Sequence, residues 1–333
     1  MFAPSGYVAS FDLAEPKSFR NLTMLPLLAR VPCDAGYVTL DQAVPTGRFR
    51  VTEVSEAGRV PELRVTNDLD LPVLLLDGEE LVGAKQNRIV NLTVLVPAKS
   101  ALTIPVSCVE AGRWNQVSAE FRPSNRTHFA EGRARKAQQV SAAMSVGSRA
   151  SDQGDVWNRV SARVAGLATP SPTSAMADAY DQVERPVDEY VEALTPVERQ
   201  AGAAFVTGGR LLGIELFDAP ETLHRILPKI VRSYALDLVL GQLRQPLETP
   251  PADLRVIEPL LGVLDGARPD EHQAIGLGTD VRWNSASATA AALQLNDRVV
   301  HFVAFPLGND ENGAGSHPGS RLQSPSWRRQ RHS

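Results

Sequence analysis

Short apolar runs separated by turn residues dominate the first third of the chain. The run at 71–76 is almost wholly apolar, which is typical of a strand buried on both faces. Pro26 interrupts an earlier run, and because proline has no backbone N–H, that strand is expected at a sheet edge. The pattern predicts antiparallel β-structure over residues 20–117. The expected strands cover residues 22–31, 48–51, 60–69, 71–76, 89–96 and 101–106.

After residue 120 the apolar residues recur at helical spacing. Residues 195–198 have the form of a capping box with proline at the first helical position, so a short helix is expected there. Asn296 and Asp297 mark the turn of a C-terminal hairpin. The other expected helices cover residues 134–168 with a weak centre at 145–154, 174–194 with an interruption near Pro186, 218–240 and 252–264. The expected strands cover residues 203–206, 211–217, 273–278, 291–295 and 298–305.

These elements indicate the α+β class, with an N-terminal antiparallel β-rich half followed by helices and a C-terminal β-hairpin. We expect one domain over residues 18–306, β-rich over 20–117 and mixed helix and strand over 118–306. A division into two domains near residue 120 is the main alternative. Residues 308–333 hold too few apolar side chains to order themselves and are expected to form a disordered tail.

The composition narrows the choice of partners and compartment. There are 34 Lys and Arg residues against 38 Asp and Glu, a net charge of −4, so nucleic acid is not an expected partner. The two cysteines, Cys33 and Cys108, are too few for a disulfide framework or a thiolate zinc cluster. The N-terminus does not have the pattern of a signal peptide, and no run of about 18 apolar residues occurs, so no membrane span is expected. Cytoplasm is the default location.

Candidate chemistry is concentrated between residues 71 and 114. Asp77, Glu79 and Glu80 follow a buried strand, where carboxylates could bind a metal or act as a base. In an extended segment Asp77 and Glu79 face one way and Glu80 the other. The alternative is that these acids only cap a turn.

A second polar group follows within a few residues. Lys85 and Arg88 suit phosphate or carboxylate, and amide side chains offer both donors and acceptors. The sugar and phosphate groups of a nucleotide would match this set, but so would a buried structural network. The members are Lys85, Gln86, Asn87, Arg88 and Asn91.

A third group comprises Ser107, Cys108, Glu110, Arg113 and Trp114. Cys108 is a candidate nucleophile if a cation lowers its pKa, but no histidine stands at a telling spacing, and a lone cysteine beside a strand is usually a small buried hydrophobe. Glu110 and Arg113 could equally pair with each other. Trp114 could stack on a base or fill the core.

Other positions add less. Arg122, Arg126, Asn125 and His128 could extend a phosphate-binding surface, although such loop charges are more often only solvated. No Walker A loop, nucleophile elbow, His-Glu-x-x-His motif or dinucleotide-binding fingerprint is present, which removes the commonest enzyme classes but not enzymes as a whole.

The polar groups lie in segments that resemble the hallmark of the ARG and rhodanese-phosphatase-superfamily-associated protein domain family. The resemblance extends over most of the chain, about residues 18–306. Leu92 and Lys99 depart from the small polar residues expected there, but neither departure touches the polar core of the motif. The matching segments are residues 77–91, 96–114, 156–157, 171–173 and 229–237.

The resemblance implies only a general function. The family is named for its association with ADP-ribosylglycohydrolases and rhodanese-phosphatase proteins and has no defined activity. This context suggests ADP-ribose or related nucleotide metabolism by association, with ADP-ribosylglycohydrolase-type proteins as functional associates. The motif positions that carry over as the expected site are Glu79, Glu80, Lys85, Gln86, Asn87, Arg88, Asn91, Ser107, Cys108, Glu110, Arg113 and Trp114.

The leading hypothesis is an intracellular domain that binds, and could process, ADP-ribose or a related phosphorylated ligand. Phosphate would be held by Lys85, Arg88 and Arg113, and ribose hydroxyls by Gln86, Asn87 and Asn91. The candidate bases are Glu79, Glu80 and Glu110, with a divalent metal as an optional cofactor. The rival hypothesis is a non-catalytic structural or regulatory module whose polar motif is an internal hydrogen-bond network.

Overall fold

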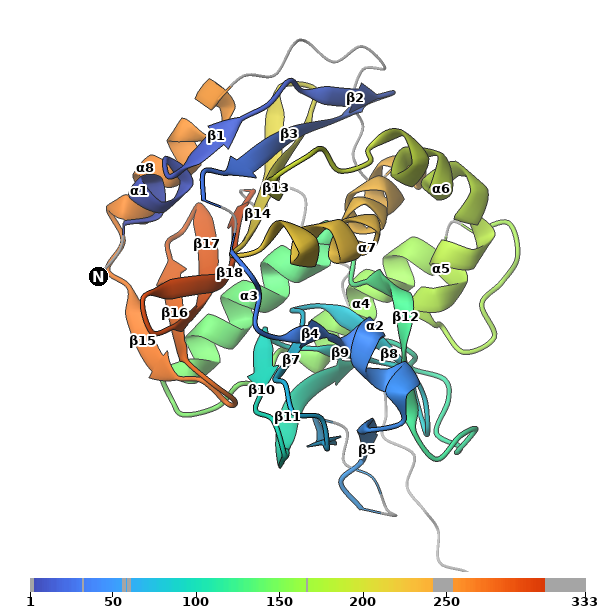
Figure 1. Ribbon diagram of the computed structural model, residues 1–333. Coiled ribbons are helices and arrows are strands. Elements are labelled where there is room, and N and C mark those ends of the chain that lie inside the picture. Colours follow the sequence, from blue (N-terminus) through green and yellow to red (C-terminus); the bar gives the residue numbers. More distant parts are fainter. Residues whose placement is uncertain are drawn as a thin grey trace, which may run out of the picture.

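A computed structural model describes residues 3–31, 33–55, 58, 61–165, 167–241 and 254–308. Within these residues the chain forms a nine-stranded sheet, a closed six-stranded barrel and a small three-stranded sheet beside the barrel. In Figure 1 the large sheet occupies the upper and left parts of the molecule, and the barrel occupies the lower part. The α+β class is therefore confirmed.

The nine-stranded sheet joins the two ends of the chain. Its order is β1-β3-β13-β14-β18-β17-β16-β15, with β2 beside β3, and all its pairs are antiparallel. The expected C-terminal hairpin is β17–β18, which turns at Asn296 and Asp297. The strands are β1 (Phe11–Leu13), β2 (Lys17–Phe19), β3 (Leu22–Ala29), β13 (Gln200–Thr207), β14 (Arg210–Phe217), β15 (Asp270–Gln273), β16 (Thr279–Asn284), β17 (Ala288–Leu295) and β18 (Arg298–Pro306).

The barrel is built from the N-terminal half and closes in the order β11-β6-β5-β12-β8-β9. Alternate residues of its strands point inward, so Val51, Val65 and Val106 belong to a buried core while Arg64 is exposed. Its strands are β5 (Phe49–Glu53), β6 (Glu62–Asn67), β8 (Glu79–Gly83), β9 (Arg88–Val90), β11 (Ser100–Cys108) and β12 (Phe121–Thr127). The small sheet contains β4 (Val38–Thr39), β7 (Val73–Leu75) and β10 (Val94–Val96).

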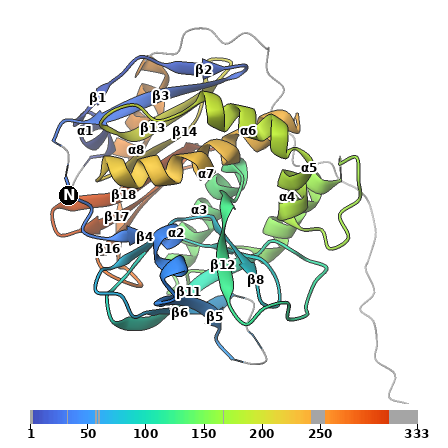
Figure 2. The ribbon, with the colours of Figure 1, turned by 45° about the vertical axis from the view of Figure 1, so that its right-hand side comes forward.

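Helices cover both faces of the large sheet. α3 and α7 pack on the face that looks toward the barrel, and α1 and α8 pack on the other face (Figures 1 and 2). The apolar residues at spacings of three and four in α7 are all buried, which explains why this segment is helical. The helices are α1 (Pro4–Val8), α2 (Leu40–Ala43), α3 (Ala130–Met144), α4 (Gln153–Val164), α5 (Met176–Gln182), α6 (Glu184–Ala193), α7 (Pro220–Val239) and α8 (Glu258–Asp265), with 3₁₀ turns at Val44–Thr46 and Leu254–Val256.

The expected edge position of β3 is wrong, because β3 lies between β13 on one side and β1 and β2 on the other. The carbonyl of Pro26 accepts a hydrogen bond from the Ala14 N–H, on the side of β1. In an antiparallel strand the N–H and the C=O of one residue point to the same side. The N–H that Pro26 lacks would therefore point toward β1 and β2, but Pro26 lies between the β3 residues paired with β1 (27–29) and those paired with β2 (22–24). The ladder therefore loses no bond at this position.

Three further expectations are corrected. No helix follows residue 195, because the Gln200 side chain accepts from the Val197 N–H at 3.0 Å and Arg199 has a φ of 60°, which turns the chain into β13. The strand expected at 89–96 is divided into β9 and β10. Of the strand expected at 273–278, Gln273 ends β15 and the other residues form the turn before β16, where Gly278 has a φ of 98°.

Two expectations fall partly or wholly outside the described residues. The first two residues of the helix expected at 252–264 lie outside them, and the rest forms the 3₁₀ turn and α8. The expected tail at 308–333 lies outside them except for Gly308. In the part of the chain that the structure covers, no helix is both long enough and apolar enough to cross a membrane.

A buried ion network on α3 connects the barrel to the large sheet. Lys136 donates to the carboxylate of Asp77, which follows β7, and to the carbonyls of Val90 and Asn91 at 3.0 and 2.8 Å. Arg133, one helical turn away, makes two bonds of 2.5 and 3.2 Å to Glu215 on β14. The bonds of Lys136 to the two carbonyls also explain why the chain leaves the sheet ladder between β9 and β10.

The network holds its charges far from solvent. Burial lowers the pKa of Lys136 to about 8 against the opposing effect of Asp77, so the ammonium group is still protonated at neutral pH. Burial alone would raise the pKa of Asp77, but Lys136 and Arg133 bring it below its usual value. Gly78, with a φ of 81°, makes the turn after Asp77, and a Cβ there would lie 2.9 Å from the Arg133 side chain.

Lys136→Met is expected to lower the free energy of unfolding by about 3–5 kcal/mol, because it leaves the Asp77 carboxylate buried without its closest cation. Urea denaturation measures the loss. Adding Asp77→Asn should recover part of it, since the second change removes the unpaired charge. Lys99→Met, which breaks an exposed ion pair with Asp70 and an exposed bond to the Asp68 carbonyl, is the control and should change stability by less than about 1 kcal/mol. Equal effects of the two lysine variants would contradict the assignment.

Candidate functional site

The two acids expected at the start of β8 lie apart and have different cation partners. Glu79 accepts from Lys229 on α7 at 2.6 Å and from the Leu76 N–H at 3.1 Å. Glu80 accepts from Arg126 on β12 at 2.9 Å and from Ser124 at 2.8 Å.

Both carboxylates of β8 are buried. Burial raises the pKa of Glu79 and of Glu80, while Lys229 and Arg126 respectively act in the opposite direction. The pair of Glu79 ties the barrel to α7, whereas the pair of Glu80 joins two adjacent strands of the barrel, β8 and β12.

One end of the barrel gathers several of the expected site residues. Arg88 begins β9, Cys108 ends β11 and Glu53 ends β5, and each stands two residues from an inward-facing valine of the barrel core. Because side chains alternate along a strand, all three point toward the barrel axis at the same end. The set Glu53, Lys85, Arg88, Cys108 and Trp114 is called the barrel mouth below.

Arg88 is the most unusual residue of the barrel mouth. Its exposed fraction is 0%, and its Nη1 donates to the Gln86 side chain at 2.8 Å. Within the described chain, its Nε and Nη2 have no hydrogen-bond partner and no carboxylate forms an ion pair with it. Burial lowers the pKa of Arg88, and nearby Cys108 and Glu53 act against that shift. The guanidinium group nevertheless stays charged, so a buried cation is left incompletely bonded.

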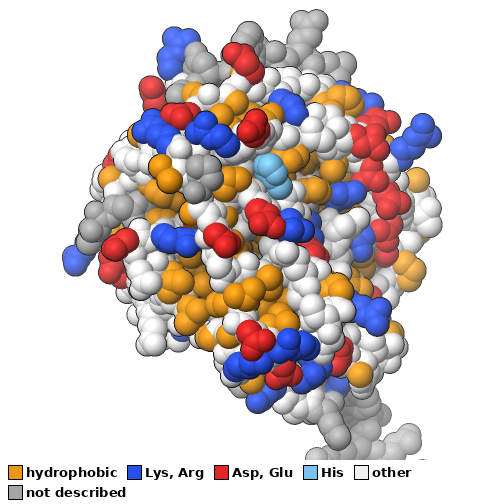
Figure 3. Space-filling view, viewed as in Figure 1, with side chains coloured by type: hydrophobic (Ala, Val, Ile, Leu, Met, Phe, Trp, Pro, Cys, Tyr) orange, Lys and Arg blue, Asp and Glu red, His pale blue; other side chains and the backbone are white. Residues whose placement is uncertain are grey.

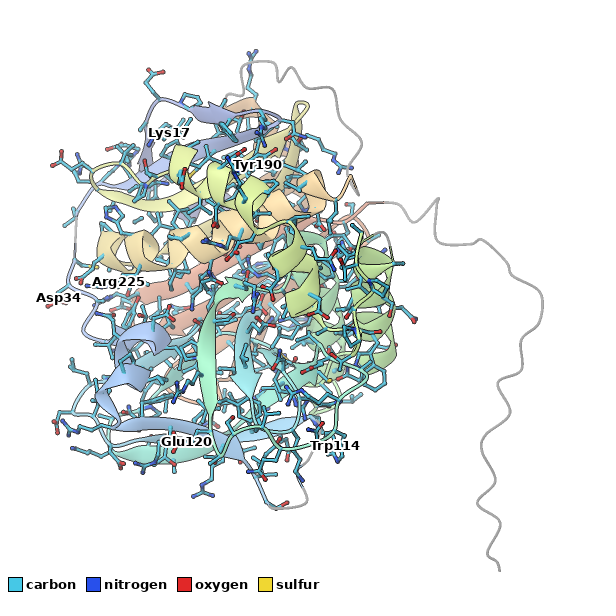
Figure 4. The ribbon with its side chains drawn as sticks, turned by 90° about the vertical axis from the view of Figure 1, so that its right-hand side faces the viewer. Lys17, Asp34, Trp114, Glu120, Tyr190 and Arg225 are labelled. Carbon is cyan, nitrogen blue, oxygen red and sulfur yellow. The ribbon has the colours of Figure 1, made fainter. Side chains whose placement is uncertain are left out.

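The ring of Trp114 lies against this guanidinium and against the Lys85 ammonium. It is 5.6 Å from the Arg88 guanidinium carbon and 5.5 Å from the Lys85 ammonium, within the range of cation–π attraction. Trp114 is 48% exposed and lies on the loop between β11 and β12, at the outer edge of the barrel in Figure 4. The two carboxylate oxygens of Glu53 are also buried, without a hydrogen-bond partner among the described residues.

Cys108 is buried and its thiol is engaged. The thiol donates to the Gln86 side chain at 3.1 Å, and its backbone exchanges two bonds of 2.8 Å with the side chain of Gln153 on α4. Gln86 in turn donates to the backbone carbonyl of Glu110 at 3.0 Å. The thiol is thus buried and bonded beside the Arg88 guanidinium, and its role as a nucleophile stays a prediction.

Glu110 and Arg113 pair with each other at 2.6 Å, as one sequence alternative had it. Glu110 also accepts from the Asn87 N–H at 3.1 Å and from Thr173 at 3.0 Å. Arg113 reaches the Asn87 side chain at 3.0 Å. Although burial acts to raise it, the bonds from Arg113, Asn87 and Thr173 lower the pKa of Glu110. These residues hold the β8–β9 turn against the loop that carries Trp114.

Asn91 and Ser107 form a separate contact. Ser107 donates to the Asn91 side chain at 2.6 Å and lies 2.5 Å from the Ser151 hydroxyl. Asn91 donates to the Arg149 carbonyl at 3.2 Å. Both residues therefore bind the segment between α3 and α4 and not the barrel mouth.

The residues on and just after β12 that were considered as an extension of the site do not gather at the barrel mouth. Arg126 pairs with Glu80 and with Asp181, Arg122 and Asn125 are exposed, and His128 is buried with its Nδ1 3.2 Å from the Met176 sulfur. Over the described ranges, no group of three His, Cys, Asp or Glu side chains is arranged to hold a metal ion.

Some residues of these clusters were not singled out in the sequence. Glu53 could have been found from its place two residues after an inward-facing strand residue, because the alternation directs it into the barrel. Lys229, Lys136 and Gln153 are far from the motif in sequence, and only the packing of helices on the barrel brings them to it.

A family model, the ARG and Rhodanese-Phosphatase-superfamily-associated Protein domain, matches residues 10–305. The chain belongs to this family. Comparisons with curated proteins and with solved structures found no significant match. The family assignment confirms the resemblance seen in the segments that contain Asp77, Arg88, Cys108 and Trp114.

Glu110→Gln is expected to lower the free energy of unfolding at neutral pH by about 1–2 kcal/mol, since solvent partly screens the lost charged bonds. The folded pKa of Glu110 lies below the ordinary value of 4.5, so the stabilisation is complete above that pH and is lost as the pH falls through the folded pKa. Urea titrations should therefore show a difference from the natural protein that narrows as the pH falls below the ordinary carboxyl value of 4.5. Glu120→Gln, an exposed acid of the same loop, is the control without such a difference. A gap that is constant with pH would argue against the charged pair.

Proposed function

We propose that this chain binds a phosphorylated, nucleotide-derived ligand, of which ADP-ribose is the leading candidate, at the barrel mouth. The observation that carries the proposal is the buried Arg88 guanidinium with two nitrogens unbonded in the described chain. Leaving charged donors buried without acceptors costs free energy, and such features are retained where a ligand supplies the acceptors. A phosphate group suits the planar donors of arginine.

The other groups of the barrel mouth match the remaining parts of such a ligand. Glu53 presents two buried carboxylate oxygens without donors, and the paired hydroxyls of a ribose would supply them. Trp114, half-exposed above Arg88, offers a ring on which an adenine could stack. Lys85 adds a second cation beside that ring. In this proposal Trp114 moves outward to admit the phosphate.

A small ligand is favoured over a nucleic acid by the distribution of charge. On the face shown in Figure 3, acidic and basic side chains are interspersed, and no broad basic area follows the surface. The net charge of −4 also disfavours binding to the negatively charged backbone of a nucleic acid.

The second candidate function is a non-catalytic structural or regulatory module. It is favoured by the ion pairs of Glu79, Glu80 and Glu110, because the three acids considered as bases are each bonded to a cation. Processing of the ligand is accordingly the weaker part of the proposal, and binding is its core. We propose residues 18–306 as the binding unit, the cytoplasm as its location, and ADP-ribosylglycohydrolase-type proteins as functional associates.

ADP-ribose at a millimolar concentration is expected to raise the melting temperature of the full chain, because a ligand of the native state stabilises it. Arg88→Met should abolish this shift and Arg88→Lys should retain part of it, since lysine keeps the charge but not the planar donors. Without ligand, Arg88→Met should melt about 3 °C earlier than the natural protein, because it removes the bond to Gln86 and the cation that opposes the charge of the buried Glu53 carboxylate. Differential scanning fluorimetry measures all three variants.

The matched control is Arg64→Gln, an exposed arginine on the outer face of the barrel, which should leave the shift unchanged. NAD and mononucleotides are added to the panel, so that the shifts show whether the protein recognises the diphosphate or the base of the ligand. Absence of any shift over the whole panel would refute the proposal, and a shift that survives in Arg88→Met would move the ligand away from the barrel mouth. If Arg88→Met melts far earlier in the absence of ligand, the structural module is favoured.

A further inference from the structure

A separate cavity of about 370 Å³ lies on the helix side of the large sheet, remote from the barrel mouth. It is bounded by α3, α7, the start of β14 and the end of β18. Its walls are mainly apolar, and this size and character are typical of small-molecule sites. The apolar residues that line it are Ala130, Ala134, Leu211, Leu212, Pro306 and Leu307.

One polar group of this wall lacks a partner. Tyr234 on α7 lines the cavity with an exposed fraction of 0%, and its ring stacks on Phe205 at 4.2 Å. Its hydroxyl has no hydrogen-bond partner among the described residues. Gly213 makes room for that hydroxyl, because a Cβ there would lie 2.3 Å from it. A buried hydroxyl without a partner costs free energy unless a ligand or water bonds it.

The charges around the cavity favour an anion at its opening. Glu131 and Asp237 line one wall, but both carboxylates are paired with Arg163, and Glu131 is also paired with Arg159. Those two arginines line a neighbouring hollow and not this cavity. Two further cations line this cavity: Arg135 on α3, which donates to Gln138 at 3.2 Å, and Arg210, which is exposed at the start of β14. Arg210 is therefore the more exposed of the two cations at the rim.

We infer that this cavity binds a small organic acid with an apolar body, as a second site that is independent of the barrel mouth. The apolar body packs between α3 and the strands, the acid group faces Arg210, and the Tyr234 hydroxyl donates to an acceptor within the ligand. Burial, with the nearby Glu215, raises the pKa of Tyr234 well above its usual value, so the hydroxyl keeps the proton that it donates.

The test uses 8-anilinonaphthalene-1-sulfonate, an apolar body with an anionic group, as a fluorescent probe on the full chain. We expect saturable binding to the native protein and competition by octanoate, with octan-1-ol competing more weakly because it lacks the charge. Tyr234→Phe should weaken probe binding by about fivefold, the effect of one hydrogen bond. The same variant should melt at or above the temperature of the natural protein, since it removes an unbonded hydroxyl and leaves the ring in place.

Two further variants separate the parts of the site. Arg210→Gln should weaken the preference for octanoate over octan-1-ol, because Arg135 still lines the cavity. Leu212→Trp should fill the cavity and block the probe. Leu13→Trp, a distant and more exposed position on β1, is the control for the added tryptophan, and Arg88→Met should leave probe binding intact. The inference is overturned if the probe does not bind, if octanoate does not displace it, or if binding is unchanged in both Tyr234→Phe and Leu212→Trp.

Discussion

The ion network of α3 is the interaction on which the rest of the structure depends. A helix that carries Lys136 and Arg133 one turn apart neutralises Asp77 beside the barrel and Glu215 in the large sheet. Buried pairs of this kind add little net stability over apolar packing, but each charge is costly to leave alone. The network therefore specifies the relative position of the two β-structures more than it strengthens either of them.

This constraint separates the polar residues of the family motif into two kinds. Asp77, Glu79 and Glu80 are neutralised by cations from other elements and hold the molecule together. Arg88, at the opposite end of the barrel strands, bonds Gln86 through Nη1, but its other nitrogens have no hydrogen-bond partner in the described chain, and neither do the carboxylate oxygens of Glu53, which stands outside the motif. Residues with satisfied charges maintain the fold, and residues with unsatisfied ones are where a ligand would contribute.

Much of the secondary structure could be predicted because it depends on local patterns. Polar and apolar residues alternate in β5 and β6 and recur at helical spacing in α7, and these local patterns do not depend on distant contacts. The predicted positions of these three elements were therefore correct. The place of β3 and the division of β9 from β10 could not be predicted, since they depend on Ala14 and Lys136, which are remote in sequence. The motif contains most residues of the barrel mouth, so that cluster could be predicted from the sequence. The contact of Asn91 with the segment between α3 and α4 could be seen only in the folded structure.

The strand order of the large sheet has a consequence for synthesis of the chain. The six strands of the barrel have all been made when β12 ends at Thr127, whereas β3 has to wait for β13, which begins at Gln200. The barrel can thus close on the ribosome while the hydrophobic edge of β3 is still unpaired. An exposed strand edge is prone to aggregation. Slow translation between α3 and β13 would prolong that exposure and increase the need for a chaperone.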